Sequence, residues 1–424
     1  MVRTFRFLIP AMFAFFAAMA TAFAQAKILI PMDNGQADHL KAYGIAYWVL
    51  SKNLPVDWLL NYKSGAFMLD YADVIAAECR IRGVTFQGIS GAQAASIYSE
   101  VQAEGNNMDV VRLESVPKIA VYVPPTFQPW DDAVTMVMEY AEIPYDKIWD
   151  KEVLDGKLKK YDWVHLHHED FTGQYGKFYA QYSNAPWYLQ QVAMLEQTAK
   201  ELGYGKVSRL KLAVAQEIKK YVAGGGFLFA MCSATDSYDI ALAAQNTDIC
   251  DVVFDGDPPA AGAQKQLDFS QTLAFENFSL EMNPYIYEYS DIDIQPNFMS
   301  NAETDAFTLF DFSAKFDPVP SMLTQCHTGV VRGFLGQTTG FHKRFIKKSI
   351  TILGEREGSD EVKYITGNFG RGTFTFYGGH DPEDYQHAVN DPPTDLSLHK
   401  NSPGYRLILN NILFPSAKKK KQKT

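Results

Sequence analysis

Cysteine is scarce in this chain, and the cysteines that occur follow no recognisable pattern. The 424 residues contain four, Cys79, Cys232, Cys250 and Cys326, and none lies in a C-x-x-C spacing. Four cysteines allow three disulfide pairings, so the sequence alone fixes no cross-link. Cys79 lies in a helix-like segment, and we expect it to be a small buried hydrophobe.

Long apolar runs and clustered positive charge are also missing. The apolar stretch from Phe7 to Ala22 is short for a membrane span, no stop-transfer charges follow it, and no other stretch reaches that length. We therefore predict no membrane span. The formal net charge is −10, whereas nucleic-acid binding needs clustered Lys and Arg, so general nucleic-acid binding is not expected.

The N-terminus has the pattern of a secretory signal. Arg3 and Arg6 precede the apolar stretch, and Ala22-Phe23-Ala24 is a small-x-small cleavage site. We predict that residues 1–24 are removed, that the mature chain begins near Gln25, and that the protein is exported to the periplasm or secreted. Residues 416–424 form a basic tail that we expect to be disordered.

The remaining residues predict an α/β protein of two doubly wound, flavodoxin-like units with parallel sheets. Strand-like and helix-like segments alternate in residues 25–115, and the alternation starts again in residues 116–415. Residues 251–361 interrupt the second unit with aromatic residues, Pro and Asp, and we interpret them as a long insertion of short strands and loops. FGRG, residues 369–372, is expected to be the turn of a hairpin after that insertion.

Three polar clusters follow predicted strands of the second unit. They begin at His165, at Cys232 and at His380. The carboxyl ends of parallel strands meet at one edge of a sheet, where functional groups collect. We therefore expect these clusters to share one site.

Cys232 is the candidate nucleophile, because it stands where a strand turns at once into a helix. The positive end of a helix favours the thiolate, and backbone N–H groups there can bind an oxyanion. In this hypothesis His380 is the base, and Glu383 or Asp381 orients its ring. The alternative is a buried and inert cysteine, which is the more common fate of this residue.

The run HLHHED predicts a possible metal site. His165 and His167 share one face of a strand, and Asp381 is the candidate third ligand for a divalent metal such as zinc or iron. The alternative is a polar strand end whose imidazoles bond to the backbone.

The turn AMCSATD and the late segment GGHDPED resemble the class I glutamine amidotransferase-like superfamily. FGRGTFTFYGGHDPEDY is most similar to the trehalose-utilisation (ThuA-like) branch of that superfamily. The resemblance implies a doubly wound fold with Cys232, His380 and Glu383 as nucleophile, base and orienting carboxylate. Ala230 and Ala234 stand where the family has glycines, and Asp381 lengthens its His-Pro-Glu triplet, so the fold transfers better than the function.

The whole chain also resembles uncharacterised exported proteins that carry the label asparagine synthetase B. SATDSYD, residues 233–239, is similar to the Ser-Gly-Gly-x-Asp-Ser loop of enzymes that adenylate aspartate. That loop needs glycines for its backbone to wrap pyrophosphate, and Ala234 and Thr235 occupy those places.

The expected partner is a small polar ligand or substrate, either an amide or a carbohydrate. Aromatic residues make up 14% of the chain, and their faces can stack on sugar rings as well as fill a core. The sequence leaves three functions open: a cysteine-dependent amidase or hydrolase, an asparagine synthetase, and a binding module without turnover.

Overall fold

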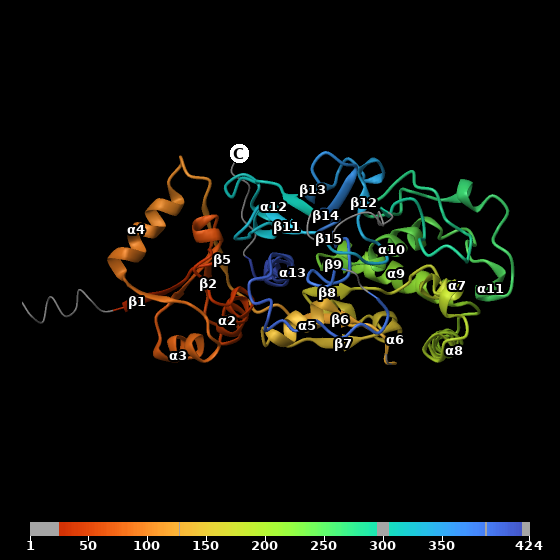
Figure 1. Cartoon of the computed structure of the whole chain (residues 1–424), viewed down its shortest axis with the longest axis horizontal. Helices are drawn as coiled ribbons and strands as arrows, with labels where there is room; N and C mark the ends of the chain where they lie inside the picture. Colours follow the sequence, from red (N-terminus) through yellow and green to blue (C-terminus); the bar gives the residue numbers. More distant parts are fainter. Residues whose placement is uncertain (1–24, 127, 295–304, 386–387, 418–424) are drawn as a thin grey trace, which may run out of the picture.

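The computed structural model describes residues 25–126, 128–294, 305–385 and 388–417. These residues form an α/β fold with two sheets (Figure 1). The predicted signal segment and residues 418–424 of the basic tail lie outside the described residues. Within the described part of the chain, no helix has both the length and the apolar character needed to cross a membrane.

The N-terminal unit is built on a sheet of strand order β4-β1-β3-β2-β5. Its elements are β1 (Gln25–Ile30), α2 (His39–Ser51), β2 (Val56–Leu60), β3 (Ala66–Asp70), α3 (Asp73–Ile81), β4 (Gln87–Ser90), α4 (Gly91–Gln102) and β5 (Asp109–Leu113). Alternate residues of the strands point to opposite faces. Leu29 and Leu59 join a small cluster with Ala94 of α4, whereas Ile28 and Leu60 join the larger core that contains α2.

The prediction of a parallel sheet in this unit is wrong. The pairs β1–β3, β1–β4, β2–β3 and β2–β5 are all antiparallel. The turn at Tyr62–Ser64 joins β2 to β3, and φ is positive at Lys63 within it and at Asn61 just before it. A connection this short forces the two strands to run in opposite directions.

The second sheet has the strand order β11-β10-β13-β14-β15-β9-β8-β6-β7, with β12 paired to β14. Its strands are β6 (Ile119–Tyr122), β7 (Asp146–Ile148), β8 (Trp163–Leu166), β9 (Phe227–Met231), β10 (Ala306–Leu309), β11 (Val330–Arg332), β12 (Phe341–His342), β13 (Thr351–Glu355), β14 (Glu361–Phe369) and β15 (Gly372–Tyr377). Strands β7, β6, β8, β9 and β15 are mutually parallel, as the sequence predicted for this unit. The expected hairpin is also present, since β14 and β15 pair in antiparallel register from Phe369 and Gly372 outward.

Helices cover both faces of the parallel strands, which explains their continuous apolar sequences. The helices of this part of the chain are α5 (Ala133–Tyr140), α6 (Asp150–Leu154), α7 (Tyr179–Tyr182), α8 (Pro186–Glu201), α9 (Val207–Ala223), α10 (Ser233–Ala243), α11 (Val252–Asp255), α12 (Pro318–Leu323) and α13 (Pro403–Leu413). Phe227 and Phe229 of β9 face the core shared with α5 and α13. Leu228 and Ala230 of the same strand face the core shared with α9 and α10.

The insertion contributes short strands to the second sheet. Strands β10, β11 and β13 continue the sheet beyond β14 in antiparallel pairs. The segment between β11 and β12 returns across the end of β9, where it covers Cys232.

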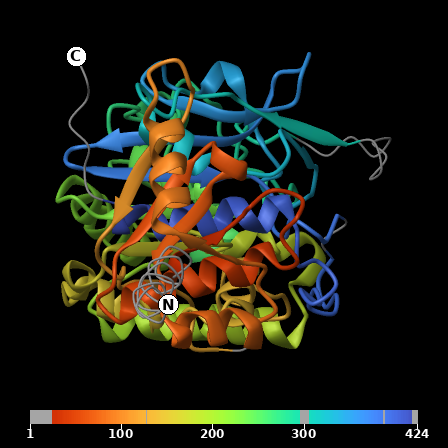
Figure 2. The same cartoon turned by 90° about the vertical axis from the view of Figure 1, so that its left-hand side faces the viewer.

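The last helix, α13, joins the two units. Figure 1 shows it between the N-terminal sheet and the second sheet, and Figure 2 looks onto the N-terminal unit from its outer side. Arg406 of α13 is fully buried and donates hydrogen bonds to the backbone oxygens of Met32 and Ser64. Tyr43 of α2 donates a hydrogen bond to Asn410 of α13. One of the hydrophobic clusters contains buried residues of both sheets and of α13.

Candidate functional site

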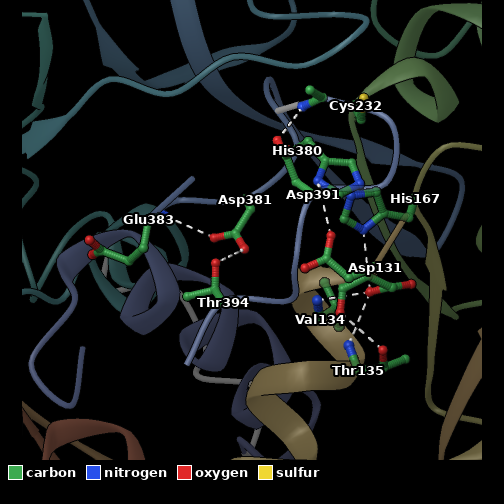
Figure 3. A network of polar contacts seen from close by, with 12 residues as sticks. Asp131, Val134, Thr135, His167, Cys232, His380, Asp381, Glu383, Asp391 and Thr394 are labelled. Atoms are coloured by element: carbon green, nitrogen blue, oxygen red, sulfur yellow. Dashed lines mark hydrogen bonds and ion pairs between the residues drawn. The ribbon is translucent and has the colours of Figure 1, made fainter. Parts of the chain in front are cut away.

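The three predicted polar clusters lie at one edge of the second sheet. Strand β9 is paired between β8 and β15, with Leu166 opposite Ala230 and Tyr377 opposite Met231. The residues that follow these strands therefore emerge side by side. Figure 3 shows His167, Cys232 and His380 together at this edge.

Cys232 joins β9 to α10 in a strained backbone conformation. Its φ is 49° and its ψ is −139°, in a region that residues with a Cβ rarely adopt. Its N–H donates to the oxygen of Tyr377 at 3.3 Å, and its oxygen accepts from the N–H of Thr235 at 3.1 Å. Both ends of the turn are thus fixed by backbone hydrogen bonds.

The thiol of Cys232 is enclosed. The residue is 1% exposed, and Sγ accepts a hydrogen bond from the N–H of Gln337 at 3.3 Å. Burial raises the pKa of Cys232 to about 11, against the opposing effect of the backbone N–H groups of Thr338, Gln337 and Ser233. The same N–H groups that face the thiol are suited to a negative charge.

A covering segment, Phe334–Thr339 of the insertion, closes the site. The ammonium of Lys363 donates to the backbone oxygens of Phe334 and Thr339, at the two ends of the segment. The N–H of His380 donates to the oxygen of Leu335 at 2.8 Å. Gly336 packs so tightly that a Cβ would lie 2.8 Å from the backbone nitrogen of His380. Access to Cys232 therefore requires this segment to move.

Two buried carboxylates lie under the covering segment. Asp236 Oδ1 accepts from the hydroxyl of Thr338 at 2.8 Å, and Asp293 Oδ1 accepts from the N–H of Thr339 at 2.8 Å. Burial raises the pKa of Asp236 to about 7 and raises that of Asp293 well above its usual range, with Asp236 adding to the latter effect. Both side chains therefore bind the covering segment through hydrogen bonds.

His165 and His167 flank a carboxylate that the sequence analysis missed. Asp132 Oδ1 lies 3.4 Å from His165 Nε2 and 3.3 Å from His167 Nδ1. Burial lowers the pKa of His165. Burial alone would also lower the pKa of His167, but Asp132, Glu169 and Asp131 outweigh it and raise that pKa. Burial likewise opposes ionisation of Asp132, but the two imidazoles keep its pKa well below its usual range.

A second imidazole group consists of His167, His168 and His380. One ring nitrogen of each lies within 4.8 Å of the others, and the ring centroids of His167 and His380 are 4.4 Å apart. Asp131 Oδ1 lies 3.9 Å from His380 Nδ1, a contact drawn in Figure 3. The carboxylate next to the predicted base is therefore Asp131.

The predicted carboxylates Glu383 and Asp381 make other contacts. Glu383 Oε2 lies 3.1 Å from Nδ1 of His399. Asp381 accepts from the N–H of Glu383 at 2.8 Å and from the hydroxyl of Thr394 at 2.7 Å. Of the predicted metal set, the structure groups His165 and His167 with Asp132, and Asp381 belongs to neither imidazole group.

One signal in the sequence identifies the missed carboxylates. Asp131 and Asp132 immediately precede the helix-like segment that becomes α5, and Asp is a preferred N-cap residue. Asp132 is that cap, since its Oδ1 accepts from the N–H groups of Val134 at 2.8 Å and Thr135 at 3.0 Å. Gln337 gave no comparable signal, because it lies 105 residues from the thiol that it contacts.

The larger of two cavities lies away from the polar clusters, and the smaller one adjoins the first cluster. A cavity of about 830 Å³ lies at the opposite end of the second sheet, where its walls include Phe227 and Gly372, the first residues of β9 and β15. A cavity of about 20 Å³ lies beside His168, with Trp130 and Glu169 in its walls. All four cysteines are unpaired.

Comparisons with known proteins give no family for the chain. No family model and no curated protein matches it. Similar solved structures include the cytoplasmic proteins STM3548 from Salmonella typhimurium and STM1381 from Salmonella typhimurium LT2, at 10% and 12% identity, each with a TM-score of 0.35 and covering 71% of this chain and 100% of the other. Another is Gan42B, a GH42 beta-galactosidase, at 11% identity and a TM-score of 0.27, covering 62% of this chain and 27% of that one. At such TM-scores these similarities carry no argument about function.

Proposed function

We propose that the chain is a cysteine-dependent acyl-transfer enzyme of the amidase type, on a doubly wound, glutamine amidotransferase-like unit. The observation that supports this most strongly is the backbone of Cys232, with φ of 49° and ψ of −139°. Strained backbone of this kind clusters at functional sites, where the surrounding structure imposes it. A strained strand-to-helix turn is also how other hydrolases expose a nucleophile.

In the proposed reaction, His380 takes the proton of the Cys232 thiol, and Sγ bonds to the acyl carbon of the substrate. The N–H groups of Ser233, Gln337 and Thr338 that face the thiol are the available donors to the oxyanion. The carbon–nitrogen bond then breaks, and His380 returns the proton to the leaving amine. Water hydrolyses the thioester and restores the free thiol.

Asp131 takes the orienting role that the sequence predicted for Glu383 or Asp381. It faces Nδ1 of His380, whereas Glu383 faces His399. A carboxylate at Nδ1 stabilises the imidazolium that forms when the opposite nitrogen accepts a proton. Burial and, as the next largest effect, the charge of Asp381 raise the pKa of Asp131 to about 6. This carboxylate is therefore mainly ionised at neutral pH.

The test is hydrolysis of a panel of small amides and esters by the chain from residue 25 onward, with EDTA present to keep the site free of metal. We expect Cys232→Ala and His380→Asn each to reduce turnover at least about 100-fold, the scale of a lost nucleophile or base. Turnover that survives Cys232→Ala would eliminate the proposal.

Labelling by iodoacetamide adds a matched comparison with Cys79. Both cysteines are buried, and burial raises the pKa of Cys79 to about 12. We expect Cys232 to react faster than Cys79, because backbone N–H groups face its sulfur. Equal rates would show that the turn does not activate the thiol.

A binding module without turnover is the second candidate, favoured by the enclosed thiol and its raised pKa. The same Cys232→Ala protein distinguishes the two, because a binding module keeps its ligand without the sulfur. Asparagine synthesis stays a prediction from the sequence label. The N–H groups of Ala234 and Thr235 are already bonded to the oxygens of His167 and Cys232, which does not favour a pyrophosphate loop. Asparagine formation from aspartate, glutamine, ATP and Mg²⁺ tests it directly.

A further inference from the structure

Three imidazoles from two strand ends converge beside the thiol. His167 and His168 follow β8, and His380 follows β15. The ring centroids of His167 and His168 are 4.8 Å apart, and those of His168 and His380 are 5.5 Å apart. His167 and His380 have no exposed surface, and His168 is half-buried. This arrangement brings one ring nitrogen of each imidazole within 4.8 Å of the other two.

A carboxylate backs two of the three rings. Asp132 faces Nδ1 of His167 at 3.3 Å, and Asp131 faces Nδ1 of His380 at 3.9 Å. The negative charge of a nearby carboxylate favours a proton on Nδ1, which leaves the lone pair on Nε2 at the other side of the ring. Histidines that bind metals almost always have such a partner.

The far nitrogen of His167 gives an independent indication of a ligand. Its Nε2 is buried and has no hydrogen-bond partner among the described residues. Buried polar atoms are nearly always paired, so an unpaired one points to an ion or a water molecule. The position of Asp132 is also fixed, because it caps α5. The carboxylate behind His167 is therefore rigidly placed.

We infer that His167, His168 and His380 bind one divalent transition metal, with zinc the best match, and leave a fourth position open. Three histidines with an open position are the ligand set of catalytic-type zinc sites. The charges of Asp131 and Asp132 would balance the two positive charges of the ion in a buried site. His165 and Asp381, which the sequence predicted as ligands beside His167, make other contacts. Nδ1 of His165 donates to the oxygen of Phe229 at 3.1 Å, and Asp381 accepts from the hydroxyl of Thr394.

Metal binding has a consequence that rests on the proposed function. His380 cannot accept the thiol proton while its lone pair is bound to the ion. Zinc and thiol catalysis are therefore mutually exclusive, and zinc acts as a reversible inhibitor of Cys232 chemistry. The metal site itself needs no contribution from the sulfur.

The experiment measures zinc content by elemental analysis and zinc affinity by competition with a chromophoric chelator. We expect one zinc ion per chain for the wild type and for Cys232→Ala, and an affinity at least about 100-fold lower for His168→Ala, the range seen when metal ligands or their partners are lost. His399→Ala is the matched control, since His399 also faces a carboxylate but is not in the imidazole group. Its affinity should equal that of the wild type.

Cobalt(II) provides the second readout. A tetrahedral site of histidines gives visible absorption bands that Cys232→Ala leaves unchanged and His168→Ala abolishes, and thermal unfolding checks that each variant is folded. A wild type that retains no zinc, or a His168→Ala protein that binds it as tightly, overturns the metal site. Amide hydrolysis that depends on Cys232 but is insensitive to zinc would leave the proposed function intact and refute only this inference.

Discussion

The strain at Cys232 makes a quantitative prediction about glycine. A left-handed or similarly disfavoured backbone costs a residue with a Cβ about 1–3 kcal/mol, and glycine avoids that cost. Changing Ala to Gly at a buried site also destabilises the protein in two ways: the lost methyl group costs about 0.8 kcal/mol, and the greater chain entropy of the unfolded state costs about 0.5–1 kcal/mol. At position 232 the relief of strain nearly offsets these two costs. We expect Cys232→Gly to be at least as stable as Cys232→Ala.

Ala234 supplies the matched control, because it is also fully buried and lies two residues away in α10. Its backbone is helical, so Ala234→Gly gains no relief of strain. We expect that change to cost about 2 kcal/mol, from about 1 kcal/mol of helix propensity and the lost methyl group. Both 232 variants lose the sulfur that accepts from Gln337, so this loss cancels in their comparison.

Urea unfolding of the four proteins at one pH measures these differences. The Ala-to-Gly step should cost at least about 1 kcal/mol less at position 232 than at position 234. An equal cost at the two positions would show that Cys232 carries no strain, and the main support for the proposed function would be lost.

Three further predictions concern the residues around the covering segment and α5. Burial raises the pKa of Asp236 to about 7, so the stability that this group contributes is present below about pH 4 and is lost as the pH rises through 7. In urea unfolding, the free energy of unfolding of the wild type should fall by about 4 kcal/mol relative to that of Asp236→Asn across that range. Parallel pH curves for the two proteins would contradict the reasoning. Lys363→Met removes both hydrogen bonds from the ammonium to the covering segment, and iodoacetamide should then label Cys232 about tenfold faster. An unchanged labelling rate would mean that another contact holds the segment over the thiol. Asp132→Ala removes both the N-cap of α5 and the charge that faces His165 and His167, whereas Asp132→Asn loses the charge but keeps an acceptor. Asp132→Ala should therefore cost about 1–2 kcal/mol more free energy of unfolding than Asp132→Asn, and equal losses would assign the effect to charge instead of capping.

The parallel core was predictable because its strands are short apolar runs that end at polar clusters. β8 and β9 both have this pattern, and their carboxyl ends lie at one edge as expected. The N-terminal unit was not predictable in the same way. Strand β3 follows β2 after a turn in which Lys63 has positive φ, and lysine gives no sequence signal for such a conformation.

The candidate site was predictable only for residues that follow strands. The sequence pointed to Cys232, His167 and His380 because each stands directly after an apolar run or a Gly-Gly turn. Asp131 belongs to a helix start on another element, and Gln337 belongs to an insertion without regular pattern. Contacts between residues so far apart depend on the path of the whole chain, which local sequence does not specify.

The position of α13 between the two sheets means that the N-terminal unit cannot finish folding before the last helix has been synthesised. Arg406 contacts Met32 and Ser64 at sequence separations of 374 and 342 residues, so the core of the first sheet stays incomplete until helix α13 has been synthesised. Contacts at such separation make folding slow. A chain shortened before residue 403 would leave the apolar side of α2 in water, and such a fragment should aggregate or be degraded even though both sheets are encoded in full.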